Sequence, residues 1–273
     1  MSVPLSIIGA LVAPPEPMLD SQRMGCSDIA AKGLRAAIAT AVACGVCAPT
    51  LAADQAVVAA PTFTVGDAWV YERTQDQGTG PARQRVALVV ERIDSDAMLL
   101  GVTLDGGRTS HNLVGLDWSH RGAANGRESV TGRPLSFPLA IGQTWTANYT
   151  TPLIHARPGF ARVRTTYTAA DWEEVSTPAG VFRALKVDAR GTIETHLASA
   201  TLALDPGRTS KREQKAPHIR QSGQPIVQAV EHDAFYYAPR LKAFAKIVEE
   251  QFNEQAVRTS RDTQVLVSFT TPP

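Results

Sequence analysis

The sequence is poor in cysteine. Its three cysteines, Cys26, Cys44 and Cys47, all lie before residue 48. The rest of the chain therefore has no thiol with which to form a disulfide, attack a substrate or hold zinc. A domain as long as residues 54–273 does not need disulfides, because a chain of this length buries roughly 70% of its surface on folding.

Familiar catalytic motifs are also absent. The chain has no His-Glu-x-x-His motif, no Gly-x-Ser-x-Gly nucleophile elbow, no Walker loop and no dinucleotide-binding glycine pattern. The histidines occur singly, and no two have the spacing of metal ligands on a strand or a helix: His111, His120, His155, His196, His218 and His232. We therefore expect neither a metal nor a cofactor.

Neither sign of charge is in excess. The formal net charge of the chain is +1 at pH 7. Proteins that bind nucleic acid through electrostatic attraction carry a marked surplus of lysine and arginine. We therefore expect no nucleic-acid partner.

Long hydrophobic runs are missing, with one exception near the N-terminus. Residues 36–48 carry no charge, Lys32 and Arg35 precede them, and the small residues Ala52 and Ala53 follow. A basic flank, a short apolar run and a small-residue cleavage site form a secretory signal peptide. The run is shorter than the ~20 residues of a membrane-spanning helix.

This pattern sets the expected domain boundaries. The signal peptide occupies residues 24–53 and begins at Met24, so residues 1–23 are expected to be a mis-assigned start or disordered. Residues 54–273 then form one exported domain, which is periplasmic or secreted.

A second interpretation concerns Cys44. Residues 41–44 (Ala-Val-Ala-Cys) resemble a lipobox, in which the cysteine becomes a lipidated N-terminus, although Ala41 stands where leucine is usual. The protein would then be an outer-membrane lipoprotein. Membrane contact is expected only in that case.

After residue 53 the apolar residues mostly alternate with polar ones, and helical periodicity is almost absent. Period-two alternation is typical of strands with one buried face. Strands are expected at residues 84–93, 98–104, 161–168, 172–177, 185–189, 227–237, 241–250 and 265–269. The composition of residues 241–250 also suits a helix, but its neighbours favour a strand.

The predicted fold is all-β. We expect a single domain of about ten antiparallel strands, arranged as a curved sheet or half-barrel, with a closed β-sandwich as the alternative. Residues 205–225 interrupt the alternation and are expected to form a polar loop. Residues 63–69 and 139–145 share a Gly-x-x-Trp pattern, which predicts two similar turns that each lead into a strand with an inward tryptophan.

The chain resembles a family of exported, β-rich bacterial proteins of unknown function. Four segments carry the resemblance, in this order: residues 65–71 (VGDAWVY), 137–145 (FPLAIGQTW), 175–187 (VSTPAGVFRALKV) and 235–240 (FYYAPR). It implies a curved antiparallel sheet, akin to the half-barrels of lipoprotein carriers. After Pro239 the chain departs from the family, because Arg240-Leu241-Lys242 replaces the usual glycine. The resemblance implies no catalytic residue.

Two clusters contain residues that could carry chemistry. Residues 117–120 (Asp-Trp-Ser-His) place an acid, a hydroxyl and the imidazole of His120 close together. On the expected strand 227–237, Glu231 and Asp233 share one face while His232 lies on the other. Paired carboxylates could catalyse hydrolysis or bind a cation. The simpler interpretation of both clusters is polar residues on a wet face.

The aromatic residues supply candidates for ligand contact. Trp118, Tyr236 and Tyr237 are the candidates, and Trp118 is expected to be exposed because its neighbours are polar and glycine-rich. Most other aromatic residues lie in alternating strands and are expected in the core.

Three functions are compatible with these features. The first is a non-enzymatic binding module of the cell envelope, for a hydrophobic ligand, a glycan or another envelope component. The second is a metal-independent hydrolase that uses carboxylates such as Glu231 and Asp233. The third is a structural subunit of an envelope assembly, for which exposed strand edges would be the sign. The missing motifs favour the first.

Overall fold

The computed structural model describes residues 57–78, 80–124, 127–153, 159–197 and 226–272. The expected signal peptide, Cys44, residues 1–23 and the polar loop 205–225 lie outside the described residues.

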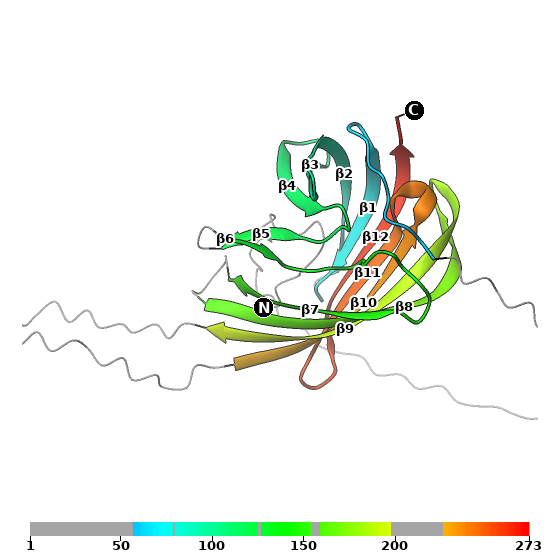
Figure 1. Cartoon of the computed structure of the whole chain (residues 1–273). Helices are drawn as coiled ribbons and strands as arrows, with labels where there is room; N and C mark the ends of the chain where they lie inside the picture. The colour runs from blue at the N-terminus through cyan, green and yellow to red at the C-terminus, as the bar shows by residue number, and fades with distance from the viewer. Residues whose placement is uncertain (1–56, 79, 125–126, 154–158, 198–225, 273) are drawn as a thin grey trace, which may run out of the picture. The chain divides into compact units, whose positions relative to one another are not determined.

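The described residues form one open antiparallel sheet of ten strands, with a separate two-stranded hairpin (Figure 1). The expected all-β fold is confirmed, and the alternative of a closed sandwich is wrong. The sheet consists of β1 (Ala68–Asp76), β2 (Pro81–Ile93), β3 (Ala97–Leu104), β4 (Thr109–Gly115), β7 (Thr144–Pro152), β8 (Gly159–Thr177), β9 (Gly180–Leu197), β10 (Ile226–Ala238), β11 (Ala243–Asn253) and β12 (Arg258–Thr270). The hairpin is β5 (Arg121–Ala124) with β6 (Arg127–Val130), and the single 3-10 turn η1 (Pro239–Leu241) separates β10 from β11.

The sheet is built from two meanders. Its strand order is β4-β3-β2-β1-β12-β11-β10-β9-β8-β7, so β1 and β12, the first and last strands among the described residues, pair in its interior. The edges are therefore β4 and β7. Residues 116–143, which include the β5–β6 hairpin, connect these two edges.

The sheet curls strongly. Phe182 on β9 and Phe269 on β12 have ring centroids 5.9 Å apart, although two strands lie between theirs. In a flat sheet strands three places apart are separated by roughly 14 Å. The face that carries these rings is therefore concave, and it holds the hydrophobic core.

Alternation along the strands accounts for most of the fold. On β8 the inward residues Val163, Thr165 and Tyr167 are buried, while Arg164 and Thr166 between them are exposed. The two strands expected at residues 161–168 and 172–177 are one strand, which is interrupted only by a register shift after Ala169. The strand expected at 241–250 is β11, preceded by η1.

The connection between the sheet edges, residues 116–143, contributes side chains to the apolar core on the concave face. Leu135 and Leu139 have no exposed surface, and Trp118 is 1% exposed. All three belong to the core cluster that also contains Trp69 and Phe244. The apolar part of the concavity is therefore occupied by the chain itself.

Two tryptophans fix the turn between β10 and β11. Trp69 Nε1 donates to the carbonyl of Leu241 (2.9 Å), and Trp118 Nε1 donates to the carbonyl of Lys242 (2.8 Å). Their rings meet edge to face, 5.4 Å apart. Lys242 Nζ lies 2.9 Å from a carboxylate oxygen of the fully buried Asp67. This turn is thus held by residues 67–69 at the start of the first meander and by the connection 116–143.

The two Gly-x-x-Trp segments build the same turn, as the sequence predicts. In the first, the carboxylate of Asp67 accepts a hydrogen bond from the N–H of Thr64 (2.8 Å). In the second, the side-chain oxygen of Gln143 accepts one from the N–H of Ala140 (3.0 Å). An aspartate and a glutamine therefore perform the same local role.

The glycines of these turns are equivalent too. Gly66 has φ +93° and donates to the carbonyl of Val90; Gly142 has φ +82° and donates to the carbonyl of Ala169. Residues with a Cβ rarely adopt such φ values, which explains why glycine stands at both positions.

Candidate functional site: a polar belt on the concave face

The paired carboxylates of β10 lie on the concave face. Glu231 accepts a hydrogen bond from the hydroxyl of Thr165 on β8. His232 between them points to the outer face, where its Nε2 is 3.2 Å from Arg190 Nη1. The alternation of the sequence thus places Glu231 and Asp233 correctly on one face.

The strand register brings further polar side chains beside them. Glu231 lies opposite Gln251, and Asp233 lies opposite Glu249, whose other neighbour is Asp262. We call the resulting row the polar belt; it crosses the concave face below the apolar core and comprises Arg73, Tyr149, Thr165, Tyr167, Glu231, Asp233, Glu249, Gln251, Asp262 and Gln264.

The side chain of Glu231 extends from β10 across β9 to β8. A Cβ on Gly191, its register partner on β9, would collide with the Glu231 carboxylate. The missing side chain at Gly191 therefore gives Glu231 room to cross β9 and reach Thr165. Glu231 is 5% exposed, and this burial raises the pKa of its carboxyl group.

An ion pair closes the other end of the belt. Arg73 Nε donates to Asp262 Oδ2 (2.7 Å), and Gln75 Nε2 donates to the same oxygen (3.1 Å). Both members of the pair are buried. Asp262 Oδ1, also buried, accepts no hydrogen bond from the described residues. The belt thus contains an acceptor that still lacks a donor.

The more accessible side of the belt is formed by half-buried groups. Asp233, Glu249 and Tyr149 are partly exposed. Burial, together with the negative charges of Glu231 and Glu249, raises the pKa of Asp233 well above its usual range. Burial and the same acids raise the pKa of Tyr149, so its hydroxyl keeps its proton.

An aromatic pair borders the belt at the sheet edge. Trp145 on β7 stacks on Tyr167 with a centroid distance of 5.7 Å and an interplanar angle of 8°. Trp145 is half-buried and donates through Nε1 to the carbonyl of Arg133 (2.8 Å). Burial raises the pKa of Tyr167, which therefore also stays protonated. The belt thus combines carboxylates, amides and phenols with a flat aromatic surface.

The aromatic candidates from the sequence lie elsewhere. The expectation that Trp118 is exposed is wrong, because the turn 116–118 folds its ring under the sheet against Phe63, Trp69 and Phe244. Tyr237 is also buried, at 1% exposure. Tyr236 is half-buried away from the belt, with Lys246 Nζ 5.5 Å from its ring centre.

The Asp-Trp-Ser-His cluster does not form a catalytic array. Asp117 is engaged by the N–H of Ser119 (3.0 Å) and by Arg133 Nε (2.8 Å). None of the hydrogen bonds between described residues joins Ser119 to His120. Burial lowers the pKa of His120 to about 4, so its imidazole is neutral at pH 7.

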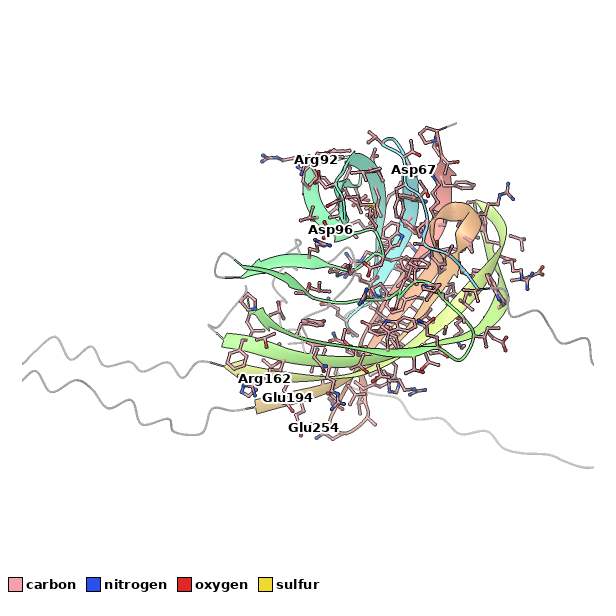
Figure 2. The ribbon with its side chains drawn as sticks, in the orientation of Figure 1. Asp67, Arg92, Asp96, Arg162, Glu194 and Glu254 are labelled. Carbon is pink, nitrogen blue, oxygen red and sulfur yellow. The ribbon has the colours of Figure 1, made fainter. Side chains whose placement is uncertain are left out.

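The described residues offer little else that resembles a site. Among them, no group of three or more histidine, cysteine or acidic side chains could hold a metal ion. No helix among them is long and apolar enough to cross a bilayer. Arg162 and Glu194, partners in the β8–β9 register, lie on the outer face (Figure 2).

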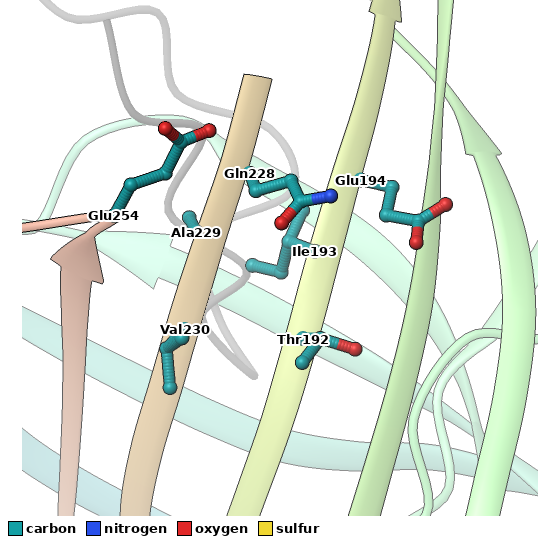
Figure 3. Close-up of a pocket in the computed structure, with 7 residues that line it drawn as sticks. All are labelled: Thr192, Ile193, Glu194, Gln228, Ala229, Val230 and Glu254. Atoms are coloured by element: carbon teal, nitrogen blue, oxygen red, sulfur yellow. The ribbon is translucent and has the colours of Figure 1, made fainter. Parts of the chain in front are cut away.

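A pocket of about 270 Å³ lies at the ends of β9 and β10 (Figure 3). Neighbouring residues of the two strands line it, with Glu254 on the far side of β10 from β9. Its lining contains none of the belt residues. It offers two carboxylates, from Glu194 and Glu254, and the hydroxyl of Thr192.

Sequence reasoning finds only part of the belt. Glu231 and Asp233 stand out as an i, i+2 pair, whereas Glu249, Asp262 and Arg73 lie on other strands. The available signal is a polar residue at a position that alternation places inward, such as Asp262 and Gln264 before the buried Leu266. Register, which the sequence does not show, decides that these residues meet.

No family model and no curated protein matches the chain. Among solved structures, it is similar to a presumed lipoprotein from Parabacteroides distasonis (TM-score 0.38, 13% identity, covering 79% of this chain and 100% of that one). It is also similar to a presumed exported protein with a YmcC-like fold from Bacteroides fragilis (TM-score 0.35, 13% identity, 79% and 100% covered). A third is the hypothetical lipoprotein YmcC of Escherichia coli (TM-score 0.35, 8% identity, 76% and 86% covered).

Proposed function

We propose that the domain is a non-enzymatic binding module of the bacterial cell envelope, and that the polar belt receives a hydroxyl-rich ligand such as an oligosaccharide. The observation that carries the proposal is the composition of the belt. Carboxylates and amides that bind hydroxyl groups lie beside the Trp145–Tyr167 stack, which offers a flat surface for a sugar ring. Binding sites commonly combine aromatic walls with a few placed polar groups.

The filled concavity argues against an acyl chain as ligand. Leu135, Leu139 and Trp118 occupy the place that a lipid would take in an open half-barrel. Apart from a small second cluster of Ala161, Val163 and Ile193, the rest of the concave face carries the polar belt, and burying a lipid against the belt would leave carboxylates without hydrogen bonds. Of the two ligand classes that the sequence leaves open, the glycan fits better.

The belt also suits binding better than hydrolysis. Hydrolysis by paired carboxylates needs one ionised and one protonated group. Burial raises the pKa of Glu231 and of Asp233, and the charge of Glu231 raises that of Asp233 further. Glu231 is 5% exposed and accepts a hydrogen bond from Thr165, so it is not placed to attack a substrate, whereas Asp233 in its protonated form donates and accepts hydrogen bonds, as a hydroxyl-rich ligand requires.

The proposal places the domain outside the cytoplasm. The signal peptide expected at residues 24–53 supports export, and the mass of the mature N-terminus distinguishes cleavage after Ala52 or Ala53 from lipidation at Cys44.

Titration calorimetry with maltoheptaose, chitotetraose and palmitate tests the ligand class. We expect at least one oligosaccharide to bind and palmitate not to bind. Tyr149→Phe removes a hydroxyl from the belt and should weaken binding about tenfold, the effect of one lost hydrogen bond.

Tyr236→Phe is the matched control, because Tyr236 lies away from the belt and should leave the affinity unchanged. Binding of palmitate, failure of both oligosaccharides to bind, or equal effects of the two tyrosine substitutions would contradict the proposal.

A further inference from the structure

Strand β7 is an edge strand without the usual protection against pairing. Natural edge strands are blunted by charged side chains, bulges or internal proline. Residues 144–152 (TWTANYTTP) contain no charge, and their proline is the last residue. The β7–β8 register runs from Thr144 to Pro152 without a shift. Among the described residues, no backbone hydrogen bond reaches the outer edge of β7.

The opposite edge of the sheet is different. Strand β4 is partly covered at its C-terminal end, where Val114 bridges to His120 and the N–H of Gly115 donates to the carbonyl of Ser119. It also carries His111, whose Nε2 is 3.1 Å from Glu91 Oε2. Within the described residues, β7 is therefore the edge strand that is open over its full length.

Strand β7 is complementary to itself. Two antiparallel copies overlap over their full length when Asn148 faces Asn148, and this register keeps the concave faces on the same side. Tyr149 of one copy then faces Ala147 of the other, so a large residue meets a small one. Trp145 likewise faces Thr151. With no charge in the strand, no like charges meet across the two-fold axis.

We propose that β7 pairs with β7 of a second copy of this chain, so that the two sheets form one continuous antiparallel sheet. Threonine pairs already cross the neighbouring β7–β8 ladder on the outer face, where Thr144 contacts Thr168 (3.3 Å) and Thr146 contacts Thr166 (3.4 Å). The outer faces of the paired β7 strands continue this polar surface.

Dimerisation enlarges the candidate site, a consequence that rests on the proposed function. Trp145 and Tyr149 lie on the concave face of β7, where Trp145 borders the belt and Tyr149 belongs to it. Pairing brings both residues of each copy to a shared seam. The two polar belts then lie on one continuous concave surface. We expect this surface to bind a polymeric glycan rather than one sugar unit.

Sedimentation velocity of the full-length chain tests the pairing. We expect a concentration-dependent dimer for the wild type. Asn148→Lys places two lysines opposite each other on the two-fold axis and should weaken the dimer at least about tenfold. Thr166→Lys is the matched control, because it adds the same charge to the outer face one strand further in. It should leave the dimer intact.

A cysteine substitution checks the register independently. In a chain whose Cys26, Cys44 and Cys47 are replaced by serine, Asn148→Cys should form a covalent dimer under mild oxidation, whereas Thr166→Cys should not, since only residue 148 faces itself. A wild type that stays monomeric at ~100 μM, well above the dissociation constants of stable dimers, overturns the proposal. So does a dimer that Asn148→Lys and Thr166→Lys affect equally. Oligosaccharide binding by a monomeric wild type would leave the proposed function standing and reject only the dimer.

Discussion

Gly191 shows how a single absent side chain shapes the candidate site. Glycine in a strand interior is normally unfavourable, because it gains no packing and loses more backbone entropy than other residues. Here its missing Cβ is the space through which Glu231 reaches Thr165. The free-energy cost of glycine at position 191 is thus linked to the burial of the Glu231 carboxylate.

This link predicts a strong coupling between residues 191 and 231. Gly191→Ala should destabilise the domain by about 1–3 kcal/mol, the usual cost of overpacking. In a Glu231→Ala background the obstacle is gone, so the same substitution should be nearly neutral. Urea unfolding of the two single variants and the double variant gives the coupling energy. Additive effects would show that the two side chains do not compete for space.

Asp233 makes a specific contribution to the pH dependence of stability. Its pKa is raised in the folded state, so between its ordinary value of 3.8 and the raised value the folded protein binds more protons than the unfolded chain. This contribution favours the folded state at low pH and is lost as the pH rises through that window. His120 acts in the opposite direction, because burial lowers its pKa to about 4.

Removing the carboxylate should flatten this dependence. We expect Asp233→Asn to gain stability relative to the wild type as the pH rises from about 4 to neutral, measured by urea unfolding at several pH values. The His120 contribution is common to both proteins and cancels in the difference. Asp188→Asn, at a side chain that is 44% exposed, is the control and should show no comparable gain. A constant difference between wild type and Asp233→Asn would contradict the prediction.

Individual site residues are harder to predict from sequence than strands are. Glu231 and Asp233 are found because period two places them on one face. The prediction of an exposed Trp118 rests on its polar neighbours Asp117 and Ser119. These neighbours indicate a turn, but they do not show that the turn buries the tryptophan ring in the core. Local composition indicates whether a segment as a whole is solvent-exposed. The burial of one side chain depends on contacts with distant residues, such as the hydrogen bond from Trp118 to the carbonyl of Lys242.

At the scale of elements, the repeated turn is the best predicted feature. The Gly-x-x-Trp pattern specifies the turn and the strand that follows because both depend on residues close in sequence. The β10–β11 connection depends on Trp69 and Trp118, which lie far from it in the chain. Pairing of β1 with β12 is likewise invisible in any local pattern.

The equivalence of the two turns can be tested directly. Gly66→Ala and Gly142→Ala should each destabilise the domain by about 1–2 kcal/mol, because both glycines have positive φ. At Gly66 a Cβ would also come within 3.2 Å of Pro272, so that variant should be affected at least as much. Thermal unfolding of both variants provides the measurement. A neutral Gly142→Ala would contradict the equivalence.

At the scale of the whole molecule, two meanders and one crossing connection divide the concave face into two parts. Residues 116–143 close the apolar part, and the strands that they leave uncovered carry the polar belt. The same connection separates the sheet edges, so within the part of the chain that the structure describes the outer edge of β7 stays unpaired next to the candidate site. The proposed binding surface and the proposed dimer edge therefore both follow from the strand order.

The pairing of the first strand with the last has a consequence for the order of folding. Arg73 and Asp262 are separated by 189 positions in the chain, yet they form one buried ion pair. A chain that emerges N-terminus first holds β1 without its second neighbour until β12 has been made. Such distant contacts slow folding, since a large loop must close before they form. The centre of this sheet is thus completed only when β12 docks beside β1.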